Sequence, residues 1–432
     1  MKRIFKSLPI LLLGLLFSAC AKESVAPFVP PVKKDPAVDA GKLNSYAPLK
    51  TYVNRKKYPN FKLGAGVTVS KYLSNSDYYE LYKDNFDELT AGNAMKHSSC
   101  VKDGGVMDFS QVKSFVAKAK QAKQTIYGHT LVWHSQQRVS YLNSLIAPIK
   151  DSTHADADEN GYRPMTTQEM KDTLTYALKA WIKGSMKATG GYVTSWDLVN
   201  EAISGGGDIN GYYVLQSMEQ SKDKNHFFWQ DYLGSIDFVR IAEKSAREEF
   251  KAAGGDPEKL LLFINDYNLE SDWDKNKKVK SLIYWINQWE SDGKCKIDGI
   301  GTQMHVSYHA KESTQKSKEN AIVEMYRLLA ASGKLIKITE LDMGYVDAEG
   351  NSVKTPDMKY NQLVEMADFY KFIISKYFEI IPAEQCYGIS QWCLTDSPAN
   401  SGWRANEPVG ILQLDYERKP AYEAYVEALQ AM

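Results

Sequence analysis

Two glutamates in this 432-residue chain each come directly after a short run of apolar residues. Glu201 follows Val193–Asn200, and Glu340 follows Leu335–Thr339. In a barrel of parallel strands, side chains at the carboxyl ends of the strands project over the mouth, where such proteins carry their chemistry. Two opposed carboxyl groups over one cleft suit cleavage of a glycosidic bond, because one can protonate the leaving oxygen while the other attacks carbon or activates water. A single strand-end glutamate is often only an ion-pair residue, so the neighbouring residues decide.

The residues near these glutamates favour the catalytic interpretation. Residues i and i+2 on a strand face the same way. Gln303 and His305 therefore share a face, and Glu340 and Asp342 share one on the following strand. A histidine placed between two carboxylates can orient a nucleophile and tune its charge, and we expect His305 to do so.

A third polar segment, Gly128–Gln136, carries His129, Trp133, His134 and Gln136. The two histidines could suggest a metal site, but a spacing of five on a strand places them on opposite faces. An indole ring and an amide side chain fit stacking on a sugar and hydrogen bonding to it. We therefore predict sugar contacts, and no metal, for this segment.

These segments belong to a pattern that repeats from residue 61 onward: an apolar run, a polar loop and an amphipathic helix. The eight runs are Phe61–Val67, Glu88–Met95, Thr125–Trp133, Val193–Asn200, Leu260–Asn265, Gly299–Met304, Leu335–Thr339 and Gly388–Gln391. Helices are expected over Phe109–Lys123 after Asp108, from the capping box of Thr166 and Glu169 to about residue 190, and from Thr355-Pro356 onward.

Eight strand–helix units predict parallel strands with helical crossovers, and hence an α/β fold of the (β/α)8 TIM barrel type. The predicted catalytic domain covers residues 51–432 as a single unit. A doubly wound open sheet is the alternative. It usually shows a Gly-rich phosphate loop after its first strand, and Phe61–Val67 has two glycines, no third at that spacing and no capped helix directly after it.

The charge balance excludes one class of function. Lys and Arg total 53, as do Asp and Glu, so the formal net charge is +0. A dedicated nucleic-acid-binding protein should be basic overall or carry a basic stripe, and no Lys/Arg-rich run is present.

The first 19 residues are expected to be an export signal. Lys2, Arg3 and Lys6 precede the apolar stretch Ile10–Phe17, which is too short for a membrane span. Small residues before Cys20 resemble a bacterial lipobox, which would make Cys20 the lipidated N-terminus of an exported protein anchored in the cell envelope, at the outer membrane or cell surface. The alternative is a cleaved signal whose cysteine is incidental.

Residues 20–50 are expected to be a flexible tether, because five of the 15 prolines fall there without apolar periodicity. The other cysteines are Cys100, Cys295, Cys386 and Cys393. Four cysteines allow three pairings, and the sequence does not select one.

Taken in order, the segments resemble glycoside hydrolase family 10, the retaining endo-1,4-β-xylanases, from about residue 45 to the C-terminus. The matching segments are Phe61–Val67, Gly128–Gln136, Trp196–Glu201, Asn265–Asn268, Gly299–His305, Ile338–Asp342 and Gln391–Asp396, followed by Trp403. Each is a modest signal alone, and all of them in register are strong. The resemblance implies hydrolysis of internal β-1,4-xylosidic bonds of xylan or xylo-oligosaccharides, with retention of configuration and without a metal or organic cofactor.

The resemblance also implies roles for single residues. Glu201 would be the general acid/base and Glu340 the nucleophile. The groups around them would be Asn200 holding the sugar 2-hydroxyl with Gln303 nearby, His305 and Asp342 supporting Glu340, Asn93, Lys96, His129 and Gln136 hydrogen-bonding the glycone sugars, Trp133, Trp392 and Trp403 walling the glycone side, and Tyr267 stacking on the leaving-group side.

The chain departs from the family pattern in its second run. The family usually has Glu where this chain has Gly92, and Trp where it has His97. That Glu normally contacts the second glycone sugar, so binding there is expected to be weaker. The segment from Gln137 to Arg163 also lacks the family's usual pattern and is expected to reshape the glycone end.

Two other functions remain open from the sequence. A relative acting on another β-1,4-glucan or on aryl xylosides would differ in pocket shape near Lys96, Trp392 and Trp403, because glucose carries a hydroxymethyl group. A surface protein that binds glycans without cleaving them would not need the pair Glu201 and Glu340 intact.

Overall fold

The computed structural model describes residues 36–432. The expected signal of residues 1–19, the lipidation site Cys20 and the tether up to residue 35 lie outside the described residues. None of the described helices is long and apolar enough to cross a membrane.

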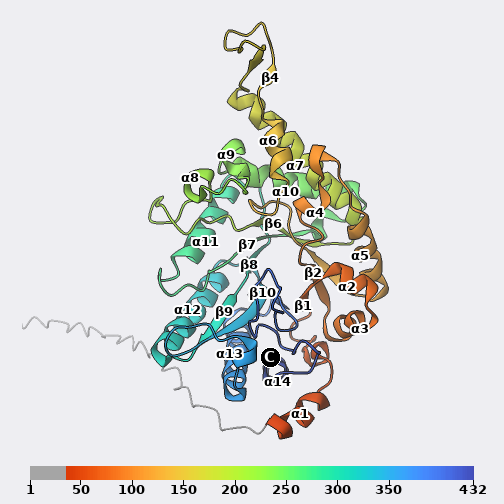
Figure 1. The fold of residues 1–432 in the computed structure, drawn as a ribbon, viewed down its shortest axis with the longest axis vertical. Helices are drawn as coiled ribbons and strands as arrows, with labels where there is room; N and C mark the ends of the chain where they lie inside the picture. The colour runs from red at the N-terminus through yellow and green to blue at the C-terminus, as the bar shows by residue number, and fades with distance from the viewer. Residues whose placement is uncertain (1–35) are drawn as a thin grey trace, which may run out of the picture.

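Eight parallel strands form a closed barrel, which confirms the predicted (β/α)8 fold (Figure 1). They are β1 (Lys62–Val67), β2 (Glu88–Ala91), β3 (Thr125–Gly128), β6 (Ser195–Asn200), β7 (Leu261–Asp266), β8 (Gly299–Thr302), β10 (Leu335–Val346) and β11 (Cys386–Gln391). The ring closes because β11 pairs with both β1 and β10. Each strand overlaps one of the eight predicted apolar runs.

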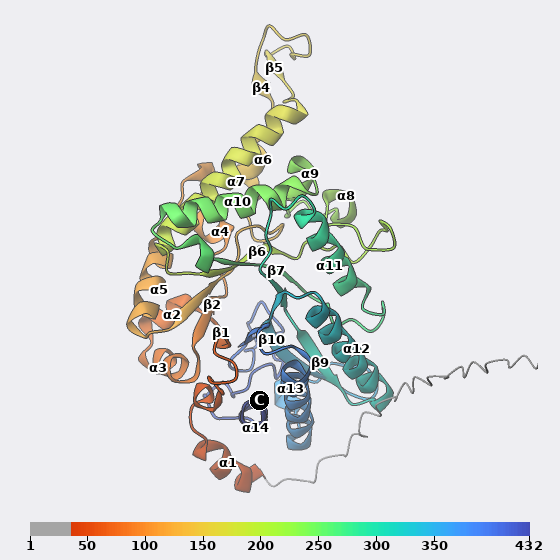
Figure 2. The ribbon, with the colours of Figure 1, turned by 180° about the vertical axis from the view of Figure 1, so that it is seen from behind.

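A helix follows each barrel strand and packs on the outside of the ring, as both views show (Figures 1 and 2). In strand order these are α3 (Ser76–Asn85), α5 (Ser110–Gln121), α7 (Thr167–Thr189), α10 (Asp237–Ala252), α11 (Lys277–Glu290), α12 (Glu312–Ala331), α13 (Tyr360–Ile380) and α14 (Pro420–Ala431). Short helices and 3-10 turns lie in the connections between these elements. They are α2 (Val69–Ser74), α4 (His97–Cys100), α6 (Val139–Leu145), α8 (Met218–Ser221), α9 (Trp229–Leu233), and 3-10 turns at Leu49–Tyr52, Asp103–Gly105, Pro257–Lys259 and Thr355–Asp357.

The helix boundaries follow local chemistry. The predicted capping box is present: Thr166 accepts from the backbone of Glu169, and the Glu169 carboxylate accepts from the backbone of Thr166. That helix ends at Gly190 in the left-handed conformation. The helix expected from Thr355 begins only at Tyr360, because residues 355–357 form a separate 3-10 turn.

The segment after Gln136 forms α6 and then a small hairpin of β4 (Ile149–Lys150) and β5 (Tyr162–Arg163). Figures 1 and 2 show this hairpin projecting from the barrel beyond the start of α7. Arg163 holds its base, with its guanidinium 3.1 Å from Asp151 and 2.7 Å from Glu169.

The expected tether is wrong over its second half. Residues 36–45 form helix α1 (Pro36–Ser45), and residues 49–52 form a 3-10 turn. Leu43 and Leu49 are buried. Arg418 donates hydrogen bonds to the carbonyls of Leu43, at 2.8 Å, and Tyr46, at 2.7 Å. Apolar side chains spaced too far apart to show periodicity still dock this segment on the barrel, near α14.

The interior of the barrel holds a buried ion pair. Lys337 on β10 donates to Glu88 on β2, and its ammonium lies 3.4 Å from the centre of the Tyr127 ring. Burial lowers the pKa of Lys337, and the charge of Glu88 opposes that change. Tyr127 in turn donates to Asp197 at 2.6 Å. Polar contacts therefore connect the middle of the barrel to the strand ends at its mouth.

Candidate active site

Glu201 and Glu340 both lie at the mouth of the barrel. Glu201 comes directly after β6 and has a left-handed backbone, with φ of 57°, a conformation that costs an L-residue about 1–2 kcal/mol. Its backbone N–H donates to the carbonyl of Asn265 at 2.7 Å, which holds this turn. Glu340 lies within β10, and its side chain is 6% exposed against 16% for Glu201. Glu201 follows its strand as predicted, whereas the prediction that Glu340 follows the end of its strand is wrong, because β10 continues to Val346.

A row of amide side chains links the two carboxyl groups. Asn265 Nδ2 donates to Glu340 Oε1 at 3.0 Å and to Asn200 Oδ1 at 2.9 Å. Gln303 Nε2 donates to Glu201 Oε1 at 2.9 Å. Because the Thr339 hydroxyl donates to Asn265 Oδ1 at 2.7 Å, the Asn265 amide can present only its nitrogen to Glu340. Asn200 Nδ2 donates to Glu201 Oε1 at 3.3 Å, which completes the connection between the two acids.

Asn265 was not among the predicted site residues. It ends the fifth apolar run, so the strand-end rule that identified Glu201 also applied to it. An asparagine there carries no charge, and although Asn265–Asn268 was one of the matching segments, only Tyr267 was assigned a role in it.

The two glutamates have pKa values shifted in opposite directions. Burial raises the pKa of Glu201, and the charges of Asp266 and Glu340 raise it further, against the hydrogen bonds from Gln303 and Trp133. Burial also raises the pKa of Glu340, but the hydrogen bond from His305, with the charges of His129, His305 and Lys96, lowers it below its ordinary value. Glu201 is therefore the better proton donor and Glu340 the better carboxylate.

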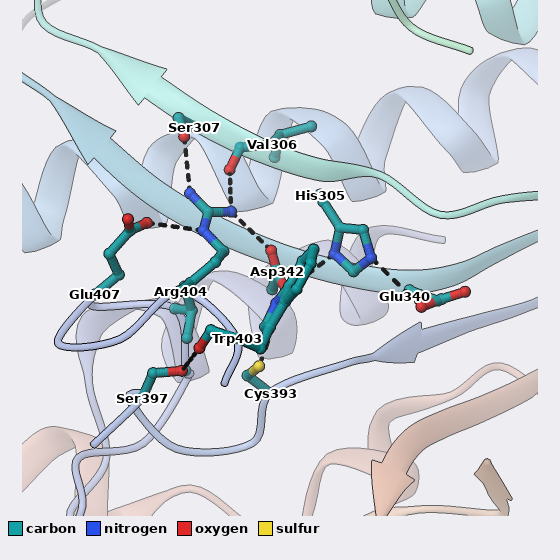
Figure 3. Close-up of polar contacts among 12 residues, drawn as sticks. His305, Val306, Ser307, Glu340, Asp342, Cys393, Ser397, Trp403, Arg404 and Glu407 are labelled. Atoms are coloured by element: carbon teal, nitrogen blue, oxygen red, sulfur yellow. Dashed lines mark hydrogen bonds and ion pairs between the residues drawn. The ribbon is translucent and has the colours of Figure 1, made fainter. Parts of the chain in front are cut away.

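His305 and Asp342 support Glu340 as predicted (Figure 3). His305 begins β9 (His305–His309), which pairs with the outer part of β10. Its Nε2 lies 3.4 Å from Glu340 Oε2, and its Nδ1 lies 2.9 Å from Asp342 Oδ2. Burial lowers the pKa of His305, but the two carboxylates outweigh this and raise it to about 10. The imidazole is therefore a cation at neutral pH, with one N–H for each carboxylate.

Three of the expected glycone contacts form one cluster. Lys96 Nζ donates to Gln136 Oε1 at 2.5 Å, and Gln136 Nε2 donates to Asn93 Oδ1 at 3.1 Å. The Lys96 ammonium also lies 4.9 Å from the centre of the Trp133 ring. Trp133 itself donates from Nε1 to Glu201 Oε2 at 3.0 Å, which ties this cluster to the acid.

His129 and Trp392 lie beside this cluster. His129 Nδ1 contacts Asp197 Oδ2 at 2.8 Å, and its ring centre lies 5.9 Å from that of Trp392. The prediction that His129 and His134 alternate along a strand is wrong, because β3 ends at Gly128. The two are nevertheless separated, since His134 stacks on Phe228 with ring centres 5.1 Å apart.

A cavity of about 580 Å³ is lined by Tyr267, His134 and the glycine run of residues 205–207. His134 joins this cavity to the acid, since its Nε2 lies 4.0 Å from Glu201 Oε2. The Lys278 ammonium lies 3.2 Å from the centre of the Tyr267 ring and 2.9 Å from Asp266, which fixes that ring at the cavity wall. The predicted stacking residue therefore lines this cavity.

The predicted catalytic and substrate-binding residues all meet at this mouth, Trp403 included, since its ring centre lies 4.5 Å from that of His305. Among the described residues, no group of three or more His, Cys, Asp or Glu side chains could hold a metal ion. The four described cysteines, Cys100, Cys295, Cys386 and Cys393, are unpaired thiols. His97, where the family has Trp, is buried, and its Nδ1 accepts from the backbone of Arg138 at 3.1 Å.

Comparison with known proteins adds a family. The model of glycosyl hydrolase family 10 matches residues 53–428. Endo-1,4-beta-xylanase C of Paenibacillus barcinonensis is 26% identical over 387 residues, which cover 86% of this chain and 31% of that protein. An endo-beta-1,4-xylanase of Cellvibrio japonicus is 28% identical over 374 residues, which cover 83% of this chain and 53% of that protein. The chain thus spans about a third to a half of the length of these relatives.

A solved structure with a bound sugar is also similar. The intracellular xylanase of Thermoanaerobacterium saccharolyticum, in complex with xylotetraose, superposes with a TM-score of 0.64 at 25% identity. The match covers 88% of this chain and 99% of that one.

Proposed function

The chain belongs to glycosyl hydrolase family 10, and on that premise we propose that it is a retaining endo-1,4-β-xylanase. The observation that carries the proposal is the pair Glu201 and Glu340, joined by amide side chains and with pKa values moved in opposite directions. Curated relatives named as endo-xylanases support the substrate class.

In the first step, the Glu340 carboxylate attacks the anomeric carbon while the Glu201 carboxylic acid protonates the departing glycosidic oxygen. The bond between that carbon and oxygen breaks, and an ester between Glu340 and the glycone sugar forms. The raised pKa of Glu201 keeps its proton available, and the lowered pKa of Glu340 keeps it ionised.

In the second step, Glu201 acts as a base. It removes a proton from a water molecule, which attacks the same carbon and releases Glu340 as a carboxylate. Two displacements at one carbon return the original configuration. Asn200 would hold the sugar 2-hydroxyl, an interaction that strengthens in the oxocarbenium-like transition state.

The sugars on either side of the bond are placed by the same logic. The leaving group must lie next to the acid Glu201, and hence along the cavity lined by Tyr267. The glycone sugars would then lie against the cluster of Asn93, Lys96 and Gln136, with His129 adding a hydrogen bond and Trp133, Trp392 and Trp403 as walls. Xylan is a long chain, which fits a site with contacts on both sides of the cleaved bond.

The alternatives make different products. A β-1,4-glucanase would release sugars from cellulose or mixed-linkage glucan, an aryl-xyloside hydrolase would leave the polymer intact, and a glycan-binding protein would release nothing. Chromatography of the early products from xylan, cellulose and mixed-linkage glucan tests the proposal. We expect a ladder of xylo-oligosaccharides from xylan, and equal or faster release from either glucan would contradict the assignment.

We also propose that the protein is exported and anchored in the bacterial envelope through lipid on Cys20. The support is the sequence alone: a basic start, a short apolar stretch and small residues before a cysteine. Detergent-phase partition separates the alternatives. We expect the parent protein in the detergent phase and Cys20→Ala in the aqueous phase, whereas a parent that stays aqueous would indicate a plain cleaved signal.

The two glutamates should respond differently to substitution. We expect Glu340→Gln to abolish turnover of every substrate, because no nucleophile remains. Glu201→Ala should lose about 10²–10⁴-fold on xylan but keep the first step for aryl xylobiosides with good leaving groups, which need little protonation. Stopped-flow release of the aryl group measures that step, and equal loss of all substrates in both variants would contradict the separate roles.

Gly92 should leave the second glycone subsite weak. A Glu at this position would accept hydrogen bonds from sugar hydroxyls, and bonds to charged groups contribute about 1.5–3 kcal/mol. There is room for the change, since a Cβ at Gly92 would meet only the carbonyl of Val67, at 3.7 Å. We expect Gly92→Glu to raise kcat/KM on xylotriose and xylotetraose, with Gly92→Gln as the size-matched control gaining less. An unchanged or lower kcat/KM for Gly92→Glu would mean that the subsite is not empty.

A further inference from the structure

Arg404 lies in the loop after β11, and its side chain lies against β9 and β10 (Figure 3). Arg404 Nη1 donates to Asp342 Oδ1 at 2.8 Å and to the carbonyl of Val306 at 2.8 Å. Its Nη2 donates to Ser307 Oγ at 2.9 Å, and its Nε to Glu407 Oε2 at 2.8 Å. All three guanidinium nitrogens therefore donate hydrogen bonds, and Nη1 is the nitrogen that meets Asp342.

Asp342 connects Arg404 to the nucleophile Glu340 through His305. Its second oxygen, Oδ2, contacts His305 Nδ1 at 2.9 Å and accepts from Trp403 Nε1 at 2.8 Å. His305 then contacts Glu340 through Nε2. Arg404, Asp342, His305 and Glu340 therefore form a row of alternating charge, which we call the relay.

The strand beneath leaves space for the guanidinium. Gly344 lies on β10, two residues beyond Asp342, and a Cβ placed there would lie 2.0 Å from Arg404 Nη2 and 2.8 Å from Glu407 Oε2. Any larger residue would have to push Arg404 off its position. The backbone of Arg404 is itself left-handed, with φ of 45°. Two independent features thus favour one placement of this side chain.

We propose that Arg404 is a positioning residue for the nucleophile, which it serves by holding Asp342 in place against His305. The proposal rests on the proposed function, because it assigns Glu340 as the attacking group. Trp403, on the same loop, also donates to the Asp342 carboxylate. Asp342 therefore holds both Trp403, which is expected to contact the glycone sugar, and His305, which supports the nucleophile. Binding of a sugar against Trp403 would thereby hold the relay in its reactive arrangement.

Other charged or titratable groups also face the relay. Lys96, His129 and Glu201 face Glu340, Glu270 faces His305, and Cys393 and Tyr370 face Asp342. From within the barrel, Asp197 and Lys337 also act on Glu340. Burial raises the pKa of Cys393 and of Glu270, which favours their neutral forms. Among these groups, Arg404 acts on Cys393 and Tyr370 and lowers the pKa of each. Removing its charge raises both pKa values further, so both groups stay neutral in the comparison below.

The sign of the effect follows from charge and geometry. Removing the Arg404 cation weakens the positive field at Glu340, and a released Asp342 weakens the grip on His305. Both changes raise the pKa of Glu340. The nucleophile then becomes protonated at higher pH, so the acid limb of kcat/KM moves upward. A loop that is merely loosened would instead lower kcat/KM by the same factor at every pH.

Three variants test the proposal on an aryl xylobioside, with kcat/KM measured from pH 5 to pH 8. Arg404→Gln removes the charge, and Gly344→Ala displaces the guanidinium while keeping it. Lys354→Met is the control, since the Lys354 ammonium lies 3.1 Å from Glu407 Oε1, the oxygen that does not accept from Arg404. We expect both of the first two to lose at least about threefold more kcat/KM than the parent between pH 7 and pH 5. The control should keep the parent profile.

A second readout needs no substrate. The Nδ1 proton of His305 should give a slowly exchanging downfield NMR signal at pH 7 in the parent, and that signal should be lost in Arg404→Gln and Gly344→Ala. A folded Arg404→Gln with the parent's acid limb and signal would overturn the proposal, as would a Lys354→Met that moves them equally. If Arg404→Gln does not fold, Gly344→Ala decides by the same criteria. A parent without activity on any xyloside would contradict the proposed function, while the His305 signal still tests the relay.

Discussion

A carboxylate that must stay ionised while it is almost wholly buried is the constraint on which the rest of this site depends. The Glu340 side chain is 6% exposed, and removing an ionised group from water costs several kcal/mol unless its charge is matched. His305 supplies that charge from 3.4 Å. The histidine is itself buried, which lowers its pKa, and the charge of Asp342 is the largest effect that raises it. Each charged group of the relay is therefore stabilised by the next one, and the relay ends at Arg404, whose guanidinium is always charged.

The barrel makes this arrangement possible by bringing strand ends from distant parts of the sequence to one mouth. Asn265 on β7 and Glu340 on β10 meet within hydrogen-bond distance, and Gln303, directly after β8, meets Glu201, directly after β6. The extension of β10 beyond the ring, paired with β9, carries Asp342 and Gly344 outward to where the loop after β11 can reach them. The same extension explains why this strand is 12 residues long while β2, β3 and β8 have four each.

The sequence was enough to predict the barrel and the position of Glu201 and Glu340 at its mouth, because both follow from local patterns. Buried parallel strands appear as short apolar runs, and a glutamate directly after such a run lies at the mouth of the barrel. The capping box at Thr166 is equally local. The parts that could not be predicted depend on contacts between distant residues. Arg404 lies in a loop without periodicity, and only the folded chain shows that it meets Asp342. Leu43 and Leu49 lie in a segment without regular apolar spacing, so nothing local distinguishes a docked segment from a tether.

The central claim is that Glu340 forms a covalent bond to the sugar during the reaction. Incubation with a 2-deoxy-2-fluoroxylobioside that carries a good leaving group slows the second step, and peptide mass spectrometry then locates the trapped sugar. The account predicts one fluoroxylobiosyl group per protein, attached to Glu340. A sugar attached to any other residue, or turnover of this reagent with inversion and no trapped sugar at all, would contradict it.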